Sequence, residues 1–334
     1  MKLSNIPAQI GKLSLFITEY AQDMALYARY CGISPMQKGR KKAFYKIMIE
    51  THAIEKGLSL ANPRHLFGRE KINHIMRMVR SYGIGSDEIP VTMAVGALET
   101  YLQRHRDLGL ADPLLDAIEA FLAERKAASA AGGTGGLRFF PEGKPAVAPE
   151  PAGLLLNRFS CRMFEKAPLD RGKIADIVHL AQTAPSQCNR QATRLHYYDD
   201  PAKVRELLAL QGGSAGFLDD VPGLFVVAFD LAAWGGAQQR NQGYVDGSLF
   251  AMTLMLAAQA HGAVTCPLNL AIRHSTERRI KAAGGIPGDQ RLVMMIAIGT
   301  AQAHDLKAAA SPRRETSEVL DFASGHAAAD VVPA

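Results

Sequence analysis

Two arginines flank a hydroxyl near the middle of the chain, in the order Arg158, Ser160 and Arg162. A guanidinium group stays charged and offers a fork of hydrogen-bond donors, so this spacing suits a phosphate or a polarised carbonyl group. Arginines at this spacing are also common on ordinary solvated surfaces. The motif therefore indicates an anion-binding site, with a plain surface role as the alternative.

A second polar cluster follows a predicted helix that starts near residue 170. Pro185 stops helical hydrogen bonding, and Ser186, Asn189 and Gln191 come directly after it. A hydroxyl and two amides supply both donors and acceptors, which is what the edge of a flat heterocycle requires. Pro, Ser and Asn are also frequent in turns, so a polar turn before a strand is the alternative.

A third segment, residues 262–269, follows a long apolar helix. Gly262 is suited to end that helix, and Pro267 forces Cys266 into an extended conformation. We expect a loop here.

In their order and spacing these three segments resemble the nitroreductase family of flavin-dependent oxidoreductases, over about residues 154–320. Asp246, Gly299 and the 312–314 segment extend the resemblance. It implies an α+β fold with a nitroreductase-like mixed sheet flanked by helices, and a homodimer with FMN at the subunit interface. The residues it assigns to the cofactor are Arg158, Ser160, Arg162, Ser186, Gln187, Asn189, Pro267, Leu268, Asn269, Arg313 and Arg314.

The resemblance also implies which part of the flavin each group of residues would contact. The first arginine motif would hold the ribityl-phosphate and pyrimidine side, and Arg313 and Arg314 would meet the phosphate. Ser186 and Asn189, with Gln187, would reach the flavin from the partner subunit. The 267–268 dipeptide would lie against the isoalloxazine face.

Departures from the family pattern leave the substrate open. Family members often have Glu near the position of Asn269, and an amide cannot act as a carboxylate base. The usual aromatic residue after Gln191 is missing, and the segment 211–217 lacks the Asn and Lys that some members direct at the flavin. No catalytic side chain is assigned. Cys188 and Cys266 are expected to be packed neutral thiols.

The function implied is that of an FMN-dependent NAD(P)H:acceptor oxidoreductase. Hydride would pass from NADH or NADPH through flavin N5 to an unidentified small-molecule acceptor. Two alternatives stay open. One is a flavin-dependent dehydrogenase of a biosynthetic intermediate that oxygen reoxidises. The other is a non-catalytic flavin-binding module that recruits a partner through residues 1–130.

Composition shifts divide the chain into three parts. Residues 131–153 contain six Gly, four Pro and four Ala, which is typical of a linker. We expect a helical domain over residues 1–130 and the nitroreductase-like FMN-binding domain over 154–334. Helical spacing predicts helices near residues 15–30, 41–56, 70–82, 91–106 and 113–126.

After residue 153, helical and strand patterns alternate, which favours the α+β class. Residues 194–199, 223–229 and 292–298 read as strands, the last two as continuous apolar runs typical of buried strands. Helices are predicted near 203–210, 244–260 and 276–283. The 244–260 segment is apolar nearly all round, which indicates a central helix.

Charge and cysteine use exclude several classes of protein. The 334 residues carry a formal charge of +6, with 18 basic against 13 acidic residues in 1–130 and 20 against 19 thereafter. Nucleic acid is an unlikely partner, because the basic cluster at 38–46 lacks an interleaved stacking pattern. Four scattered cysteines exclude a disulfide scaffold and suit a reducing cytoplasm. We expect no metal site and no membrane span, and residues 1–16 do not resemble a signal peptide.

Overall fold

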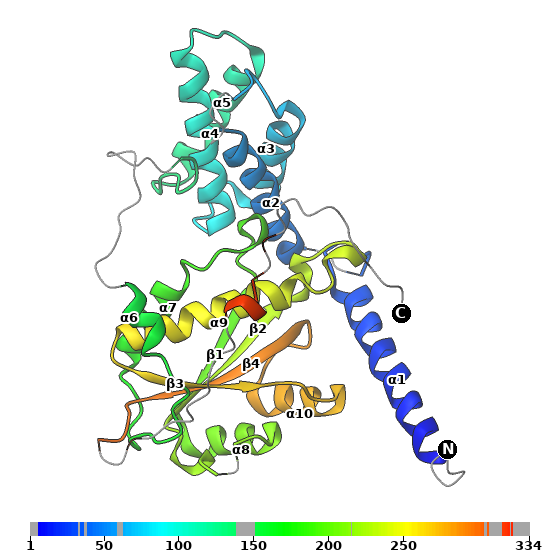
Figure 1. The fold of residues 1–334 in the computed structure, drawn as a ribbon. Coiled ribbons are helices and arrows are strands. Elements are labelled where there is room, and N and C mark those ends of the chain that lie inside the picture. The colour runs from blue at the N-terminus through cyan, green and yellow to red at the C-terminus, as the bar shows by residue number, and fades with distance from the viewer. Residues whose placement is uncertain are drawn as a thin grey trace.

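The computed structural model describes residues 6–32, 34–36, 39–58, 63–137, 151–214, 216–303, 306, 316–320 and 322. Figure 1 shows an α+β region that contains the sheet, with most of the helical N-terminal region above it and the first helix extending down beside it. The helices of the N-terminal region are α1 (Ile6–Tyr30), α2 (Arg40–Leu58), α3 (Arg69–Gly83), α4 (Ile89–Asp107) and α5 (Pro113–Ala128).

The α+β region is built on a four-stranded sheet. Its strands are β1 (Thr193–Tyr198), β2 (Gly223–Asp230), β3 (Val264–Asn269) and β4 (Gln290–Gly299), in the order β1-β2-β4-β3. All three neighbouring pairs are antiparallel, and a parallel bridge joins Ser160 to Thr265. The helices are α6 (Pro151–Leu156), α7 (Arg171–Ala181), α8 (Pro201–Gln211), α9 (Gln242–Ala260) and α10 (His274–Gly284). The predicted α+β class is confirmed.

Alternation along the buried strand β2 explains the layers of this region. Leu224 and Val226 point into a core shared with α8 and α10, whereas Phe225 and Val227 point into a core shared with α7 and α9. The sheet is therefore covered on both faces (Figure 1). A strand buried on both faces has to be apolar along its whole length, as this one is.

One sequence-based expectation was wrong. The segment predicted as a loop after Gly262 contains strand β3, which pairs with β4 along its length, with Pro267 opposite Ile296. Proline lacks an N–H group, so a strand tolerates it where that position needs no ladder donor, as at a sheet edge. Because β3 is an outer strand of this sheet, its proline does not interrupt the central ladder.

The helical region has its own apolar core. Ile72, Ile75, Met76 and Val79 of α3 are all buried in it, which confirms the face predicted from their spacing. Residues 131–137, the start of the predicted linker, lie against α4. The backbone N–H of Thr134, for example, donates to the Thr92 carbonyl over 2.9 Å. The remainder of that segment up to residue 150 lies outside the described residues, and α6 begins at 151.

A buried ionic network joins α2 to the end of β2. Asp230 is fully buried and accepts hydrogen bonds from the Tyr45 hydroxyl and from Lys41 Nζ, the latter over 2.8 Å. Arg194 of β1 lies 3.0 Å from the same carboxylate. Burial raises the pKa of Tyr45, so its hydroxyl stays a donor. These contacts connect the two regions directly, beside the buried Trp234.

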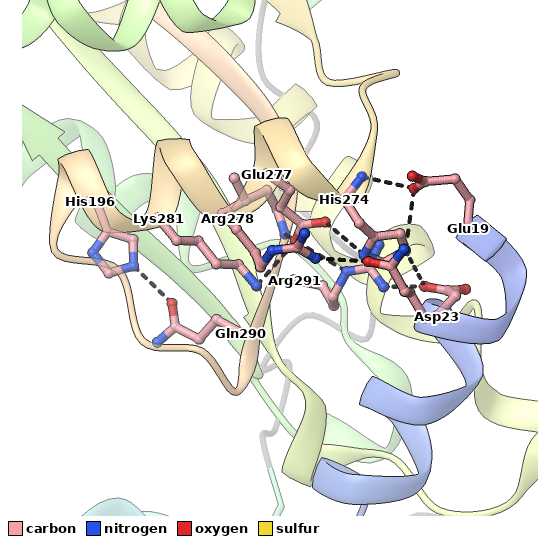
Figure 2. Close-up of polar contacts among 11 residues, drawn as sticks. Glu19, Asp23, His196, His274, Glu277, Arg278, Lys281, Gln290 and Arg291 are labelled. Carbon is pink, nitrogen blue, oxygen red and sulfur yellow. Dashed lines mark hydrogen bonds and ion pairs between the residues drawn. The ribbon is translucent and has the colours of Figure 1, made fainter. Parts of the chain in front are cut away.

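Helix α1 is attached to the α+β region by a second ionic cluster (Figure 2). Glu19 accepts from the backbone N–H of His274 over 2.8 Å, and Asp23 forms an ion pair with Arg291. Arg291 also donates to Glu277 over 3.1 Å. Of the helices that the structure describes, none is both long and apolar enough to cross a membrane.

Candidate functional site

The first predicted motif lies alongside the outer edge of β3. Ser160 forms the bridge to Thr265, and the Cys161 N–H donates to the Thr265 carbonyl over 2.9 Å. Arg162 is exposed next to this edge. The Nη1 atom of Arg158 is buried and has no hydrogen-bond partner among the described residues. A buried guanidinium donor without an acceptor is costly, so this atom is a ligand-binding candidate.

A small cavity of about 180 Å³ lies at Arg158, between the start of the motif and the end of α9. The nearby thiol of Cys266 is buried. That burial raises its pKa, and the positive charges of Arg162 and Arg158 oppose the rise. The thiol is therefore neutral at pH 7, as the sequence predicted for a packed cysteine, and both guanidinium groups are close to β3.

The three predicted residues on β3 differ in how they are presented. Leu268 is buried in the core on the α8 and α10 side, Pro267 is half-buried and Asn269 is exposed. Neighbouring strand residues point to opposite sides of a sheet, so the side chains of Pro267 and Leu268 lie on opposite faces of β3. The Asn269 side-chain oxygen accepts from the Ala271 N–H over 3.2 Å. The backbone carbonyl of Asn269 accepts from the side-chain amide of Gln211.

The second predicted motif forms a turn that leads into β1. The Ser186 hydroxyl accepts from the Gln191 N–H over 3.1 Å, and the Asn189 side-chain oxygen accepts from the Gln191 amide over 3.1 Å. Asn189 Nδ2 faces the sulfur of Met93 on α4, at 3.9 Å, and thioether sulfur is a weak acceptor. The loop therefore touches the helical region.

Backbone strain is concentrated in this same loop. Cys188, Asn189 and Gln191 all have φ near +50°, a left-handed conformation that non-glycine residues adopt rarely. Such residues cost on the order of 1–3 kcal/mol each and occur at ligand clamps. Asp246 of α9 holds the loop by accepting from the Gln187 N–H over 2.9 Å.

Arg190 is the buried residue of the loop. Its guanidinium lies 5.1 Å from the centre of the Trp234 ring, and it donates to the side-chain oxygen of Gln187. Neither Arg190 nor Asp246 is among the sequence-predicted site residues. The sequence pattern could have indicated Asp246, because it is an isolated carboxylate in an otherwise apolar helix.

Within one chain the two motifs lie apart. The 186–191 loop precedes β1 at one edge of the sheet, whereas the 158–162 motif runs beside β3 at the other. The structure thus brings the first motif together with residues 267–269 and does not bring the loop to them. Arg313 and Arg314 lie outside the described residues.

Comparison with known proteins supports the resemblance of the α+β region to nitroreductases. Residues 155–211 and 203–300 match the model of the Nitroreductase family. No curated protein matches the chain significantly.

Solved structures similar to this chain include an FMN-dependent nitroreductase from Clostridium difficile R20291. It is 22% identical, with 52% of this chain and 97% of that chain covered and a TM-score of 0.42. NfrA2 of B. megaterium is 19% identical, with 54% and 76% covered and a TM-score of 0.47. CLA-ER, an enone reductase of gut-bacterial fatty acid saturation metabolism, is 22% identical, with 54% and 100% covered and a TM-score of 0.46.

The family match begins at the first residues of the α+β region and ends with β4, so it spans both predicted motifs and the whole sheet. The resemblance noted from the sequence is thereby confirmed: the α+β region of this chain belongs to the nitroreductase family.

Proposed function

We propose that this protein is an FMN-dependent oxidoreductase that uses NADH or NADPH to reduce a small-molecule acceptor. The observation that carries the proposal is the buried Nη1 donor of Arg158, which has no acceptor among the described residues. The oxygens of an FMN phosphate or pyrimidine ring are acceptors of the kind that this donor needs. The residues of the β3 edge therefore fit the cofactor that nitroreductases use.

A homodimer explains why the two motifs lie at opposite edges of the sheet. In a symmetric pair, the loop of one subunit would reach the β3 edge of the other. Val245, Leu249 and Met252 of α9 form an exposed apolar stripe, with exposed fractions of 50%, 44% and 39%. Their spacing places them on one helix face, which a second copy would cover.

When bound, the flavin would supply the redox chemistry by accepting hydride from the nicotinamide and passing electrons to the acceptor. The chain's own residues bind and orient it. Arg158 and Arg162 offer fixed positive charge, and Ser160 is held beside β3 by the bridge to Thr265. Pro267 gives the strand a rigid surface. Asn269 supplies amide hydrogen bonding in place of a carboxylate.

We also propose the division into a helical domain over residues 1–130, a linker over 131–153 and a flavin domain over 154–334.

The four cysteines of the chain are free thiols, which suits action in the cytoplasm.

Replacement of Arg158 tests the cofactor proposal. A charge-assisted hydrogen bond contributes about 1.5–3 kcal/mol, so Arg158→Ala should raise the Kd for FMN about ten- to a hundredfold. Titration of apoprotein with FMN, followed by flavin fluorescence, measures this. Arg171→Ala is the matched control, because that arginine is exposed and pairs with Asp199 on the surface. A wild-type protein that is colourless and binds no added FMN would refute the proposal.

The rate at which NADH or NADPH reduces the bound flavin separates an enzyme from a non-catalytic flavin module. Stopped-flow bleaching of the flavin absorption band, measured at nearly saturating NADH or NADPH, gives that rate for each nicotinamide. An enzyme is expected to show rapid bleaching followed by reoxidation when an acceptor is added.

A further inference from the structure

A cavity of about 530 Å³ lies between the helical region and the loop that leads into β1. Phe44 and Met48 of α2 and Ile89 of α4 line it from the helical region. Ser186 and Gln191 line it from the loop. Its volume is in the ordinary range for small-molecule sites. The family match starts at residue 155, so Phe44, Met48 and Ile89 belong to the part of the chain outside that match.

The position of this cavity relates it to the flavin site. The inference rests on the proposed function, in which the 186–191 loop reaches the flavin of the partner subunit. Asp246 and Phe250 of α9 line the cavity, and their neighbours Val245 and Leu249 belong to the exposed stripe. The cavity therefore borders the face that the proposed dimer covers, next to the loop that would contact the flavin.

The charged groups of the cavity wall are already engaged. Among the described lining residues, Arg194 is the one cation, and it lies 3.0 Å from the Asp230 carboxylate. It also donates to backbone carbonyls of Gln191 and Thr193. Asp246 is buried and negatively charged, and it accepts two hydrogen bonds. An anionic ligand would thus meet a carboxylate without gaining an unpaired cation.

Apolar side chains make up much of the remaining surface. They are Phe44, Met48, Ile89, Val178, Leu195 and Phe250. The polar groups beside them are neutral, a hydroxyl and amides among them. A wall of this kind favours a neutral, largely apolar ligand, despite the net positive charge of residues 1–130.

We infer that the electron acceptor binds in this cavity as a neutral, predominantly apolar molecule, and that Phe44 and Ile89 of the helical region determine which acceptors are used. The helical region is then part of the substrate site in addition to its structural role. Ile89 is the informative position, because its side chain is 39% exposed at the first turn of α4. We therefore expect its replacement to leave the fold intact.

The test compares two acceptors that share a ring system and differ in charge: 1,4-naphthoquinone and its 2-sulfonate. Full-length protein with bound FMN is reduced with dithionite and mixed with each acceptor in a stopped-flow instrument, and flavin reoxidation is followed. Chemical reduction removes the nicotinamide step from the measurement. The readout is the ratio of the second-order rate constants, sulfonate over neutral quinone, for each variant.

Ile89→Lys should raise that ratio about tenfold, the equivalent of roughly 1.4 kcal/mol, and Ile89→Glu should lower it. Leu108→Lys is the control, since it adds the same charge at an exposed residue beyond the other end of α4 and should leave the ratio unchanged. If FMN binds normally and both Ile89 variants keep the wild-type ratio, the inference is wrong while the proposed function stands. If no variant binds FMN, including wild type, both fail.

Discussion

Removing the buried carboxylate of Asp230 should loosen the helical region from the α+β region. Asp230→Asn keeps the shape of the side chain and removes its charge. Lys41 then retains only Asp289, at 2.7 Å, and Arg194 loses its carboxylate partner. The hydroxyl of Tyr45 is left with a weaker, neutral acceptor.

The expected loss of stability follows from this geometry. Breaking a buried ion pair by removing one partner costs about 3–5 kcal/mol. Lys41 and Arg194 are each more than a third exposed, and Lys41 keeps a second carboxylate, so the lower end applies. With a urea m-value of about 3 kcal/mol/M, a loss of about 3 kcal/mol lowers the unfolding midpoint by about 1 M.

Intrinsic fluorescence provides the assay, because Trp234 is the single tryptophan of the chain. It is fully buried in the same cluster as Tyr45, next to the network. Urea unfolding followed at this tryptophan therefore reports the junction between α2 and β2. Tyr45→Phe, alone and combined with Asp230→Asn, completes a double-mutant cycle with an expected coupling of at least about 1 kcal/mol.

Asp219→Asn is the matched control. Asp219 forms an ion pair with Arg205 on the surface, where both side chains are at least 60% exposed, and such pairs contribute about 0–1 kcal/mol. If Asp230→Asn lowers the midpoint no more than Asp219→Asn does, the network does not hold the two regions together. A coupling of zero with Tyr45→Phe would lead to the same conclusion.

Two further predictions concern α10 and α9. Burial lowers the pKa of His274 below its ordinary 6.5, so the folded state binds a proton less readily than the unfolded state. Stability should therefore fall as the pH drops from about 7 through 6.5 toward the lower folded pKa, and His274→Gln should flatten that part of the curve of urea midpoint against pH. An unchanged slope would show that folding does not lower the pKa of His274. Leu249→Lys places a charge in the exposed stripe of α9, and light scattering at micromolar concentration should show a shift from twice the chain mass toward one chain mass. A variant that stays at twice the chain mass would place the dimer interface elsewhere.

The sequence alone determined features that depend on short-range patterns. The apolar spacing of α3 identified its buried face, because residues three and four apart share one side of a helix. The continuous apolar run of β2 identified a strand covered on both faces. The order of the Arg158, Ser186 and Cys266 segments identified the family, since that order depends on no knowledge of how the chain folds back on itself.

Other features depended on which distant segments meet. The 264–269 segment read as a loop because Pro267 weakens a strand pattern, and only its place at a sheet edge beside β4 makes it a strand. The contact of Tyr45 with Asp230 joins residues 185 positions apart, and no local pattern predicts such a pair.

Tertiary structure likewise decided where the predicted site residues lie. Sheet order places the Ser186 loop and the Arg158 motif at opposite edges, although the sequence presents them as neighbouring motifs. It also brings Ile89 of the helical region to the wall of the same cavity as Ser186. Local preference selects helix or strand, but the partner of each element is chosen by the burial of apolar surface and the pairing of buried charge over the whole chain.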